Sequence, residues 1–198
     1  MIKWILFDQG QVQTYHVFSI KESYSINGKS FESDTLDAVF YTERYYDFMI
    51  GKISEDTFIK SFLHTKNLDL SIQEFKELFK MGIKAVDGMK ELLNELNRSF
   101  NIATLINESF EWAQYKLDVS DFRKFFKEVI TSGDLGISKP DKEFYLKALE
   151  IIKATPEECL FIDDREENCT SAQNLGIDSI VFRNSEQLRK ELSVRKIL

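Results

Sequence analysis

Three aspartates stand directly after short apolar runs, and their spacing could support chemistry. Asp8 follows Ile5-Leu6-Phe7, while Asp163 and Asp164 follow Leu160-Phe161-Ile162. Because parallel strands end at one edge of a sheet, the three carboxylates could converge there. Grouped carboxylates repel one another unless a cation lies between them, and Mg²⁺ prefers such oxygen ligands. Single aspartates after strands usually serve as turn or cap residues, so it is the group of three that favours a metal site.

Two other polar residues occupy comparable positions. Asn107 follows the predicted strand 101–106, and Lys139 lies in the turn-rich loop 133–140. Pro140 disfavours helical geometry at the residue before it, so Lys139 is expected to extend over the same sheet edge. A lone loop lysine is more simply a solvated surface residue. In the company of three aspartates, Lys139 is interpreted as a functional cation.

The elements that must position these residues alternate between strand and helix beyond residue 86. Strands are predicted over 2–7, 101–106, 128–131, 160–162 and 179–182. Helices are predicted over 89–96, 112–126, 144–152 and 168–175, with an interruption near 118–121. Short apolar runs closed by turn residues are typical of strands buried on both faces. This alternation predicts a Rossmann-like, doubly wound parallel sheet of the α/β class.

The region between the first strand and this alternation has another pattern. Residues 17–85 are rich in aromatic and charged side chains, and their apolar residues recur at helical spacing. Ser54 is expected to cap one helix, and Ser71 with Glu74 fits the capping box of another. The aromatic residues at 40–48 are interpreted mainly as core of this unit. We therefore expect an inserted all-helical domain over 15–85, and a core formed by 1–14 and 86–198.

Charge and composition exclude some classes of protein. The 198 residues carry a formal net charge of −7, which argues against a nucleic-acid or anionic-membrane binder, since both need a basic face. No apolar run reaches the ~18 residues of a membrane span, and the N-terminal run is too short for a signal peptide. A cytoplasmic location is therefore the default expectation. Cys159 and Cys169 are expected to be reduced core residues.

The order of these segments resembles the haloacid-dehalogenase-like (HAD) superfamily, subfamily I, with a helical cap between the first and second motifs. The resemblance is carried by Phe7-Asp8, Lys139-Pro140, Phe161-Ile162-Asp163-Asp164 and the later Ala172-Gln173-Asn174-Leu175-Gly176. It extends over nearly the whole chain. It implies a Mg²⁺-dependent phosphatase that acts on a small phosphorylated metabolite, with the cap closing over the active site.

The resemblance also implies a role for each matching residue. Asp8 would attack phosphorus and form an aspartyl-phosphate, which divides one difficult hydrolysis into two easier steps. Lys139 would neutralise the nucleophile and the transferring phosphoryl group, and Asn107 would help to bind the phosphate.

The metal site implied by the resemblance includes more than side chains. Asp164 matches the principal acidic ligand of Mg²⁺, and Asp163 is its neighbour in the same motif. The carboxylate of Asp8 and the backbone carbonyl at Gly10 would complete the protein's share of the ligands.

Two positions depart from the family pattern. Gly10 stands where phosphatases of this family usually carry an acid, and general acid–base catalysis typically contributes ~10²–10⁴-fold. Ile106 stands where a Ser or Thr hydroxyl usually binds the phosphoryl oxygen. A register shift by two residues would place Thr104 there instead. His16 could serve as a surrogate acid, because imidazole ordinarily titrates near 6.5.

These departures keep two other functions open. One is an HAD-fold protein that binds a phosphorylated ligand or a partner with little or no turnover. The other is a haloacid dehalogenase, whose nucleophilic aspartate also lacks the second acid and needs no metal. The glycine at position 10 resembles phosphatases more than dehalogenases, which place an aromatic residue there.

Overall fold

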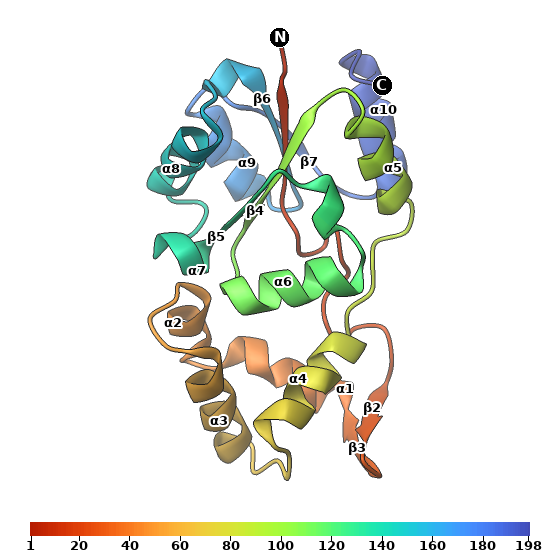
Figure 1. Cartoon of the computed structure of the whole chain (residues 1–198), viewed down its shortest axis with the longest axis vertical. Helices are drawn as coiled ribbons and strands as arrows, with labels where there is room; N and C mark the ends of the chain where they lie inside the picture. Colours follow the sequence, from red (N-terminus) through yellow and green to blue (C-terminus); the bar gives the residue numbers. More distant parts are fainter.

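Five parallel strands form the central sheet of the computed structural model, which describes residues 1–198. The strands are β1 (Trp4–Phe7), β4 (Asn101–Ile106), β5 (Glu128–Thr131), β6 (Cys159–Asp163) and β7 (Asp178–Val181). Their order is β5-β4-β1-β6-β7, with every neighbouring pair parallel. Helices flank both faces of this sheet (Figure 1). The predicted doubly wound α/β core is confirmed.

The central strand β1 shows why this segment is buried on both faces. Ile5 and Phe7 belong to one hydrophobic cluster of the core, while Leu6 between them belongs to another. Successive side chains of a strand point to opposite faces, so a run of apolar residues suits a sheet that is covered on both sides. Phe7 is paired with Thr104 on one side and Ile162 on the other, which brings Asp8 and Asp163 to the same edge.

The helices of the core follow the strands closely. They are α5 (Met89–Leu96), α6 (Phe110–Val119), α7 (Ser132–Leu135), α8 (Lys142–Ile152), α9 (Glu166–Gln173) and α10 (Ser185–Val194), with 3-10 turns η2 (Arg123–Phe125) and η3 (Pro156–Glu158). The predicted interruption near 118–121 is present, because α6 ends at Val119 and Asp121 has a φ of 58°. The C-terminal helix α10, which is capped by Asn184, was not predicted.

The inserted region contains α1 (Ser33–Asp37), η1 (Ala38–Tyr41), α2 (Tyr45–Met49), α3 (Glu55–Thr65) and α4 (Ile72–Met81). The cap at Ser54 and the capping box of Ser71 with Glu74 are confirmed. The prediction of an all-helical insertion needs one correction, because β2 (Ser23–Ile26) and β3 (Lys29–Glu32) form an antiparallel hairpin. Asn27 and Gly28 have φ values of 50° and 77°, the two left-handed residues that a tight type I′ hairpin turn requires.

The insertion has its own aromatic core, and one residue of the sheet domain belongs to it. Trp112 on α6 is fully buried in this cluster, and its ring centroid lies 4.1 Å from that of Phe79. The rings of Phe48 and Phe58 stack in the same cluster, with their centroids 4.6 Å apart. Figure 1 shows α6 between the sheet and the inserted helices. The apolar packing is therefore continuous from α6 into the insertion.

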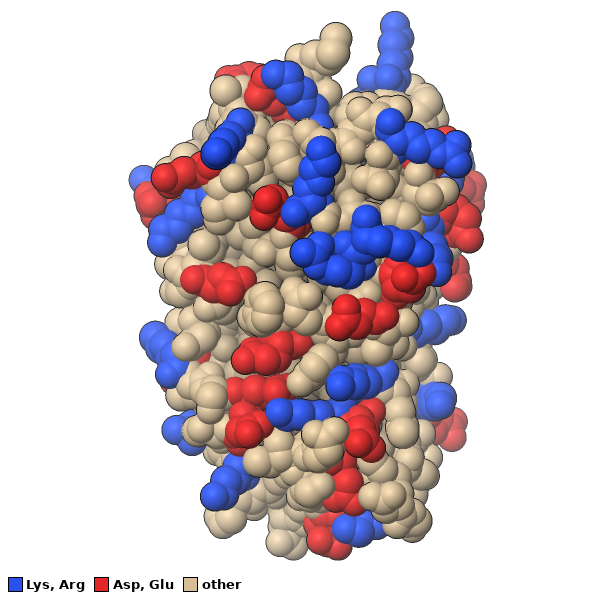
Figure 2. Space-filling view, viewed as in Figure 1, with Lys and Arg blue, Asp and Glu red and all other residues tan.

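The chain leaves and re-enters the sheet domain at one place. Thr14 forms a parallel bridge with Gly10 and an antiparallel bridge with Ala85, so the outgoing and returning segments lie side by side. On the face shown in Figure 2, acidic and basic side chains are interspersed. None of the helices combines the length and the apolar character needed to cross a bilayer. Cys159 and Cys169 are both buried as free thiols.

Candidate active site

The ammonium group of Lys139 is the centre of the polar cluster at the carboxyl edge of the sheet. It donates to Asp8 Oδ1 at 2.6 Å, to Asp163 Oδ2 at 2.7 Å and to the carbonyl of Leu105 at 2.7 Å. Only 1% of the lysine side chain is exposed. All three N–H donors of a lysine are thereby used, so the ammonium is fixed between the two carboxylates.

The loop that carries Lys139 is held by Asn107 at the end of β4. The Asn107 Oδ1 accepts from the backbone N–H of Lys139 at 2.8 Å, and Nδ2 donates to the Lys139 carbonyl at 2.8 Å. Asn107 also lines the cavity above the sheet edge. One Nδ2 hydrogen is left for a ligand, so its predicted contact with phosphate stays a prediction, while the contacts present position Lys139.

The two adjacent aspartates differ in their surroundings. Asp163 is completely buried, and its oxygens accept from Lys139, from the backbone N–H of Arg165 at 2.9 Å and from Asn168 Nδ2 at 3.0 Å. Asp164 is half-buried and lines the cavity. Asp163 is thus held by several donors besides Lys139, whereas Asp164 lines the space where a ligand would lie.

The predicted metal ligands converge. Asp8, Asp163 and Asp164 each offer a carboxylate oxygen, and these oxygens lie within 4.8 Å of one another. Asn168 Oδ1 is buried beside them without a hydrogen-bond donor, and it is the kind of oxygen that a water in the hydration shell of an ion would satisfy. Oxygen donors around a small polar space suit a hard ion such as Mg²⁺. The residues present fit this metal.

The charge balance supports the same conclusion. Burial raises the pKa of Asp8 to about 7, against the opposing effect of Lys139, and Asp163 raises it further. Burial and Asp163 also raise the pKa of Asp164. Burial lowers the pKa of Lys139, but Asp8 and Asp163 more than offset this and leave it above its ordinary value. A charged lysine therefore faces an excess of carboxylates, which a divalent cation would relieve.

The two departures from the family pattern are visible in the site. Gly10 lines the cavity, and a Cβ added there would meet no atom within 4 Å. Ile106 lines the cavity with an apolar side chain. The alternative in which Thr104 supplies the missing hydroxyl is wrong. Its Oγ1 is buried, donates to the Phe7 carbonyl at 2.9 Å and accepts from Gln13 Nε2 at 2.7 Å.

A cavity of about 210 Å³ lies above these residues. It is lined by Asp8, Asn107 and Asp164 at the strand ends, together with His16, Phe40 and Tyr45 of the inserted region. Glu108 and Lys116 form a salt bridge of 2.9 Å in its wall. No sequence pattern signalled this pair, because Glu108 precedes α6 and Lys116 lies eight residues later, beyond helical neighbour spacing.

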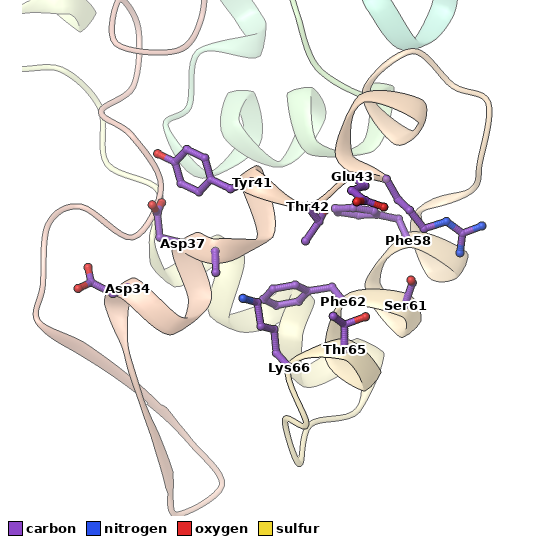
Figure 3. A pocket seen from close by; sticks show the side chains of 12 residues that line it. Asp34, Asp37, Tyr41, Thr42, Glu43, Phe58, Ser61, Phe62, Thr65 and Lys66 are labelled. Atoms are coloured by element: carbon purple, nitrogen blue, oxygen red, sulfur yellow. The ribbon is translucent and has the colours of Figure 1, made fainter.

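A second, larger cavity of about 750 Å³ lies within the inserted region (Figure 3). It is lined by residues of the α1–η1 segment and of α3, including Asp34, Asp37 and Lys66. It contains none of the converging carboxylates. The smaller cavity is therefore the candidate active site. Asp37 connects the two, because its carboxylate lies 2.6 Å from Nε2 of His16, which lines the smaller cavity.

Comparison with known proteins agrees with this fold. Residues 23–182 match the family model of haloacid dehalogenase-like hydrolases, and the chain belongs to this family. It is 31% identical over 150 residues to flavin mononucleotide hydrolase 1 of Arabidopsis thaliana, covering 75% of this chain and 60% of that protein. It is 25% identical over 206 residues to D-ribitol-5-phosphate phosphatase of Bacteroides thetaiotaomicron, covering 98% of each. These two relatives are named as a hydrolase and a phosphatase.

Solved structures show the same fold. A HAD-family enzyme of Bacteroides thetaiotaomicron, solved with magnesium and inorganic phosphate, superposes with a TM-score of 0.74 at 18% identity, over 93% of this chain and 96% of the other. L-2-haloacid dehalogenase of Xanthobacter autotrophicus gives a TM-score of 0.67 at 18% identity, over 100% of this chain and 85% of the other. At these identities the likeness concerns the fold, which both phosphate-binding and dehalogenating proteins share.

Proposed function

We propose that this chain is a Mg²⁺-dependent phosphatase that hydrolyses a small phosphorylated metabolite through an aspartyl-phosphate on Asp8. The observation that carries the proposal is the contact of Lys139 with both Asp8 and Asp163, 2.6 and 2.7 Å away, beside Asp164. The phosphatase names of relatives and the magnesium and phosphate bound to a structural neighbour support it. Residues 15–85 would act as the cap over a core of 1–14 and 86–198.

The reaction follows from what the chain's residues can do. A carboxylate oxygen of Asp8 attacks phosphorus, the ester P–O bond breaks, and the leaving alkoxide takes a proton from solvent water, which regains one when water attacks in the second step. Water then attacks the phosphorus of the acyl phosphate, which releases inorganic phosphate and restores the Asp8 carboxylate. Lys139 holds its positive charge beside Asp8 throughout and stabilises the negative charge of the phosphoryl group.

The metal-binding residues would be Asp8, Asp164 and the backbone carbonyl of Gly10, with Asp163 behind them. When bound, Mg²⁺ supplies positive charge that lets an anionic nucleophile approach an anionic ester. Asp163 contributes indirectly, because it is buried and holds both Lys139 and Asn168 in place. Asn107 supports the loop of Lys139 and retains one N–H for a phosphoryl oxygen.

Binding without turnover is the second candidate, and Gly10 with Ile106 favours it. Gly10 has no side chain that could donate a proton to a leaving group. Ile106 has no hydroxyl that could donate a hydrogen bond to a phosphoryl oxygen. In that case the carboxylates and Lys139 would still hold a metal and a phosphorylated ligand. The dehalogenase alternative is third, since the fold is shared and its nucleophile would again be Asp8.

The experiment that separates these functions measures product release. Wild type, Asp8→Asn and the surface control Asp118→Asn are assayed with a panel of phosphomonoesters and with a 2-haloacid, in Mg²⁺ and in chelator. We expect phosphate release that requires Mg²⁺, is abolished in Asp8→Asn and is unchanged in Asp118→Asn. Chloride release without phosphate release would instead identify a dehalogenase. Metal-dependent phosphate binding without any turnover would identify a binding protein.

A further inference from the structure

Every basic side chain that lines the active-site cavity already has a carboxylate partner. The four are His16, Lys116, Lys139 and Arg165. Their pairs are Lys139 with Asp8 and Asp163, Lys116 with Glu108 at 2.9 Å, Arg165 with Glu167 at 2.6 Å, and His16 with Asp37 at 2.6 Å. Only Lys139 sits where the phosphoryl group would bind. The rest of the cavity therefore offers no unpaired cation to a second anionic group.

The pair of Lys116 with Glu108 is the one that matters most, because it is buried. The side chains are 9% and 2% exposed, and Glu108 also accepts from the backbone N–H of Ser109 at 3.1 Å. The hydroxyl of Tyr45 lies 3.4 Å from both carboxylate oxygens. Drawing Lys116 toward a substrate carboxylate would leave Glu108 buried and unpaired, which is strongly unfavourable.

The two remaining basic side chains, Arg165 and His16, are poor binding partners for a second anionic group of the substrate. Arg165 is 62% exposed at its side chain, so water and salt screen its attraction for an anion. His16 is held by Asp37 in the wall of the inserted region. An anionic leaving group would in addition approach the carboxylate of Glu108. The electrostatics of the wall therefore favour a leaving group without charge.

The size of the cavity limits the substrate further. Its 210 Å³ is below the ~300–1,000 Å³ typical of sites for drug-sized ligands. A phosphoryl group occupies much of that space, so only a short chain fits beside it. The bulk of a nucleotide or a flavin would have to lie outside this cavity.

The same wall is well supplied with groups that bind hydroxyls. Tyr45 offers a hydroxyl oxygen, and Gln11 and Asn107 offer side-chain amides. We propose that the substrate is the phosphomonoester of a short, uncharged polyhydroxy alcohol, selected by the Glu108–Lys116 pair against esters that carry a carboxylate. This inference rests on the proposed phosphatase function.

The first test uses three esters of matched or graded structure. Glycerol 1-phosphate is neutral beyond its phosphate, 3-phosphoglycerate has the same carbon count with a carboxylate, and flavin mononucleotide is bulky. With the full chain and Mg²⁺, we expect kcat/KM for glycerol 1-phosphate to exceed that for either of the others by roughly tenfold or more. Equal or better turnover of 3-phosphoglycerate or flavin mononucleotide would overturn the inference.

Equilibrium binding separates this inference from the proposed function. Calorimetric titration of the same esters into Asp8→Asn gives their ranking without any turnover. If wild type hydrolyses nothing, the phosphatase proposal fails, and the binding ranking still decides the substrate class. Preferred binding of glycerol 1-phosphate supports the inference, whereas preferred binding of the carboxylate ester or the flavin contradicts it.

The second test changes the pair itself. Glu108→Gln keeps the shape of the side chain and frees the charge of Lys116, so the kcat/KM ratio of 3-phosphoglycerate to glycerol 1-phosphate should rise about tenfold or more. Glu55→Gln is the matched control, because Glu55 is a buried carboxylate 2.7 Å from Lys76 but lies outside the cavity. The kcat/KM ratio of 3-phosphoglycerate to glycerol 1-phosphate in Glu55→Gln should equal that of wild type.

An unchanged ratio in Glu108→Gln, or the same rise in Glu55→Gln, would contradict selection by the pair. Far-UV circular dichroism checks that both variants fold. If Glu108→Gln does not fold, the wild-type ranking and the binding titrations decide the inference on their own.

Discussion

Asn107 holds the main chain of Lys139 with both ends of its side-chain amide, through two hydrogen bonds of 2.8 Å. The two residues are 32 positions apart, and one lies at the end of β4 while the other lies in the loop before α8. This contact fixes the backbone from which the buried ammonium reaches Asp8. The position of the lysine charge therefore depends on a neutral residue that touches neither carboxylate.

The variant Asn107→Ala should lower kcat by roughly 10- to 100-fold while the protein stays folded, because a small displacement of a catalytic charge is costly. A double-mutant cycle with Lys139→Ala tests the cause. If Asn107 acts through Lys139, its substitution should have little further effect once the lysine is gone. Fully additive losses in kcat would show instead that Asn107 acts on the phosphate directly.

Gly10→Asp should raise the rate if the missing acid limits turnover. An added Cβ meets no atom within 4 Å, so the substitution is sterically open. Gly10→Asn is the matched control, since it has the same shape and no acid. We expect kcat for an alkyl phosphate to be about 10²-fold higher in Gly10→Asp than in Gly10→Asn, the lower end of what general acid–base catalysis contributes. Equal rates in the two variants would show that proton transfer is not limiting.

Much of the catalytic edge could be predicted from the sequence because it is built from strand ends. Asp8 and Asp164 follow buried strands directly, Asp163 is the last residue of one, and the parallel sheet brings such positions together whatever the loops do. The role of Lys139 is indicated by the three aspartates predicted at the same sheet edge and by Pro140 after it. The positions of these residues depend on local sequence patterns, so they can be predicted without knowledge of the tertiary structure.

The walls of the cavity could not be predicted in the same way. Glu108 and Lys116 meet although they are eight residues apart, and His16 meets Asp37 only because two segments of the insertion, 21 residues apart, pack together. Such pairs depend on tertiary packing rather than spacing. The hairpin differs, because its turn signal Asn27-Gly28 joins strands of only four residues each, which are too short for a clear alternating pattern.

The metal-free protein should lose stability as the pH rises through neutrality. The pKa of Asp8 is raised to about 7, with burial as the main cause, and that of Asp164 is raised as well. A carboxyl with a raised pKa binds its proton more tightly in the folded state. Its stabilising contribution is therefore complete below about pH 4 and is lost as the pH rises through about 7.

Thermal melts in chelator between pH 5 and 7.5 check this effect. The difference in Tm between wild type and Asp8→Asn isolates the titration of Asp8 from that of other groups. We expect wild type to lose Tm relative to Asp8→Asn as the pH rises. Added Mg²⁺ should stabilise wild type more at pH 7.5 than at pH 5, since it favours ionised ligands. A Tm difference that is constant with pH would contradict the raised pKa.

Trp112 should be the residue whose loss most weakens the connection between the inserted region and the core. Its Nε1 donates to Glu55 Oε1 at 3.1 Å, and its ring is fully buried among the aromatic residues of the insertion. Trp112→Phe removes the hydrogen bond to a buried carboxylate, at a cost of about 1–3 kcal/mol in the free energy of unfolding. Trp112→Ala also leaves a cavity and should cost about 3–5 kcal/mol.

Urea denaturation of these variants, with Trp4→Phe as the control, tests the assignment. Trp4 is only partly buried, at the rim of another cluster, so its substitution should cost less than that of Trp112. Wild type should unfold in one transition, because α6 contributes to both the insertion and the sheet domain. In Trp112→Ala the insertion loses its shared residue, and circular dichroism should then show it melting at lower urea than the sheet. A single transition in Trp112→Ala would place the coupling elsewhere along α6.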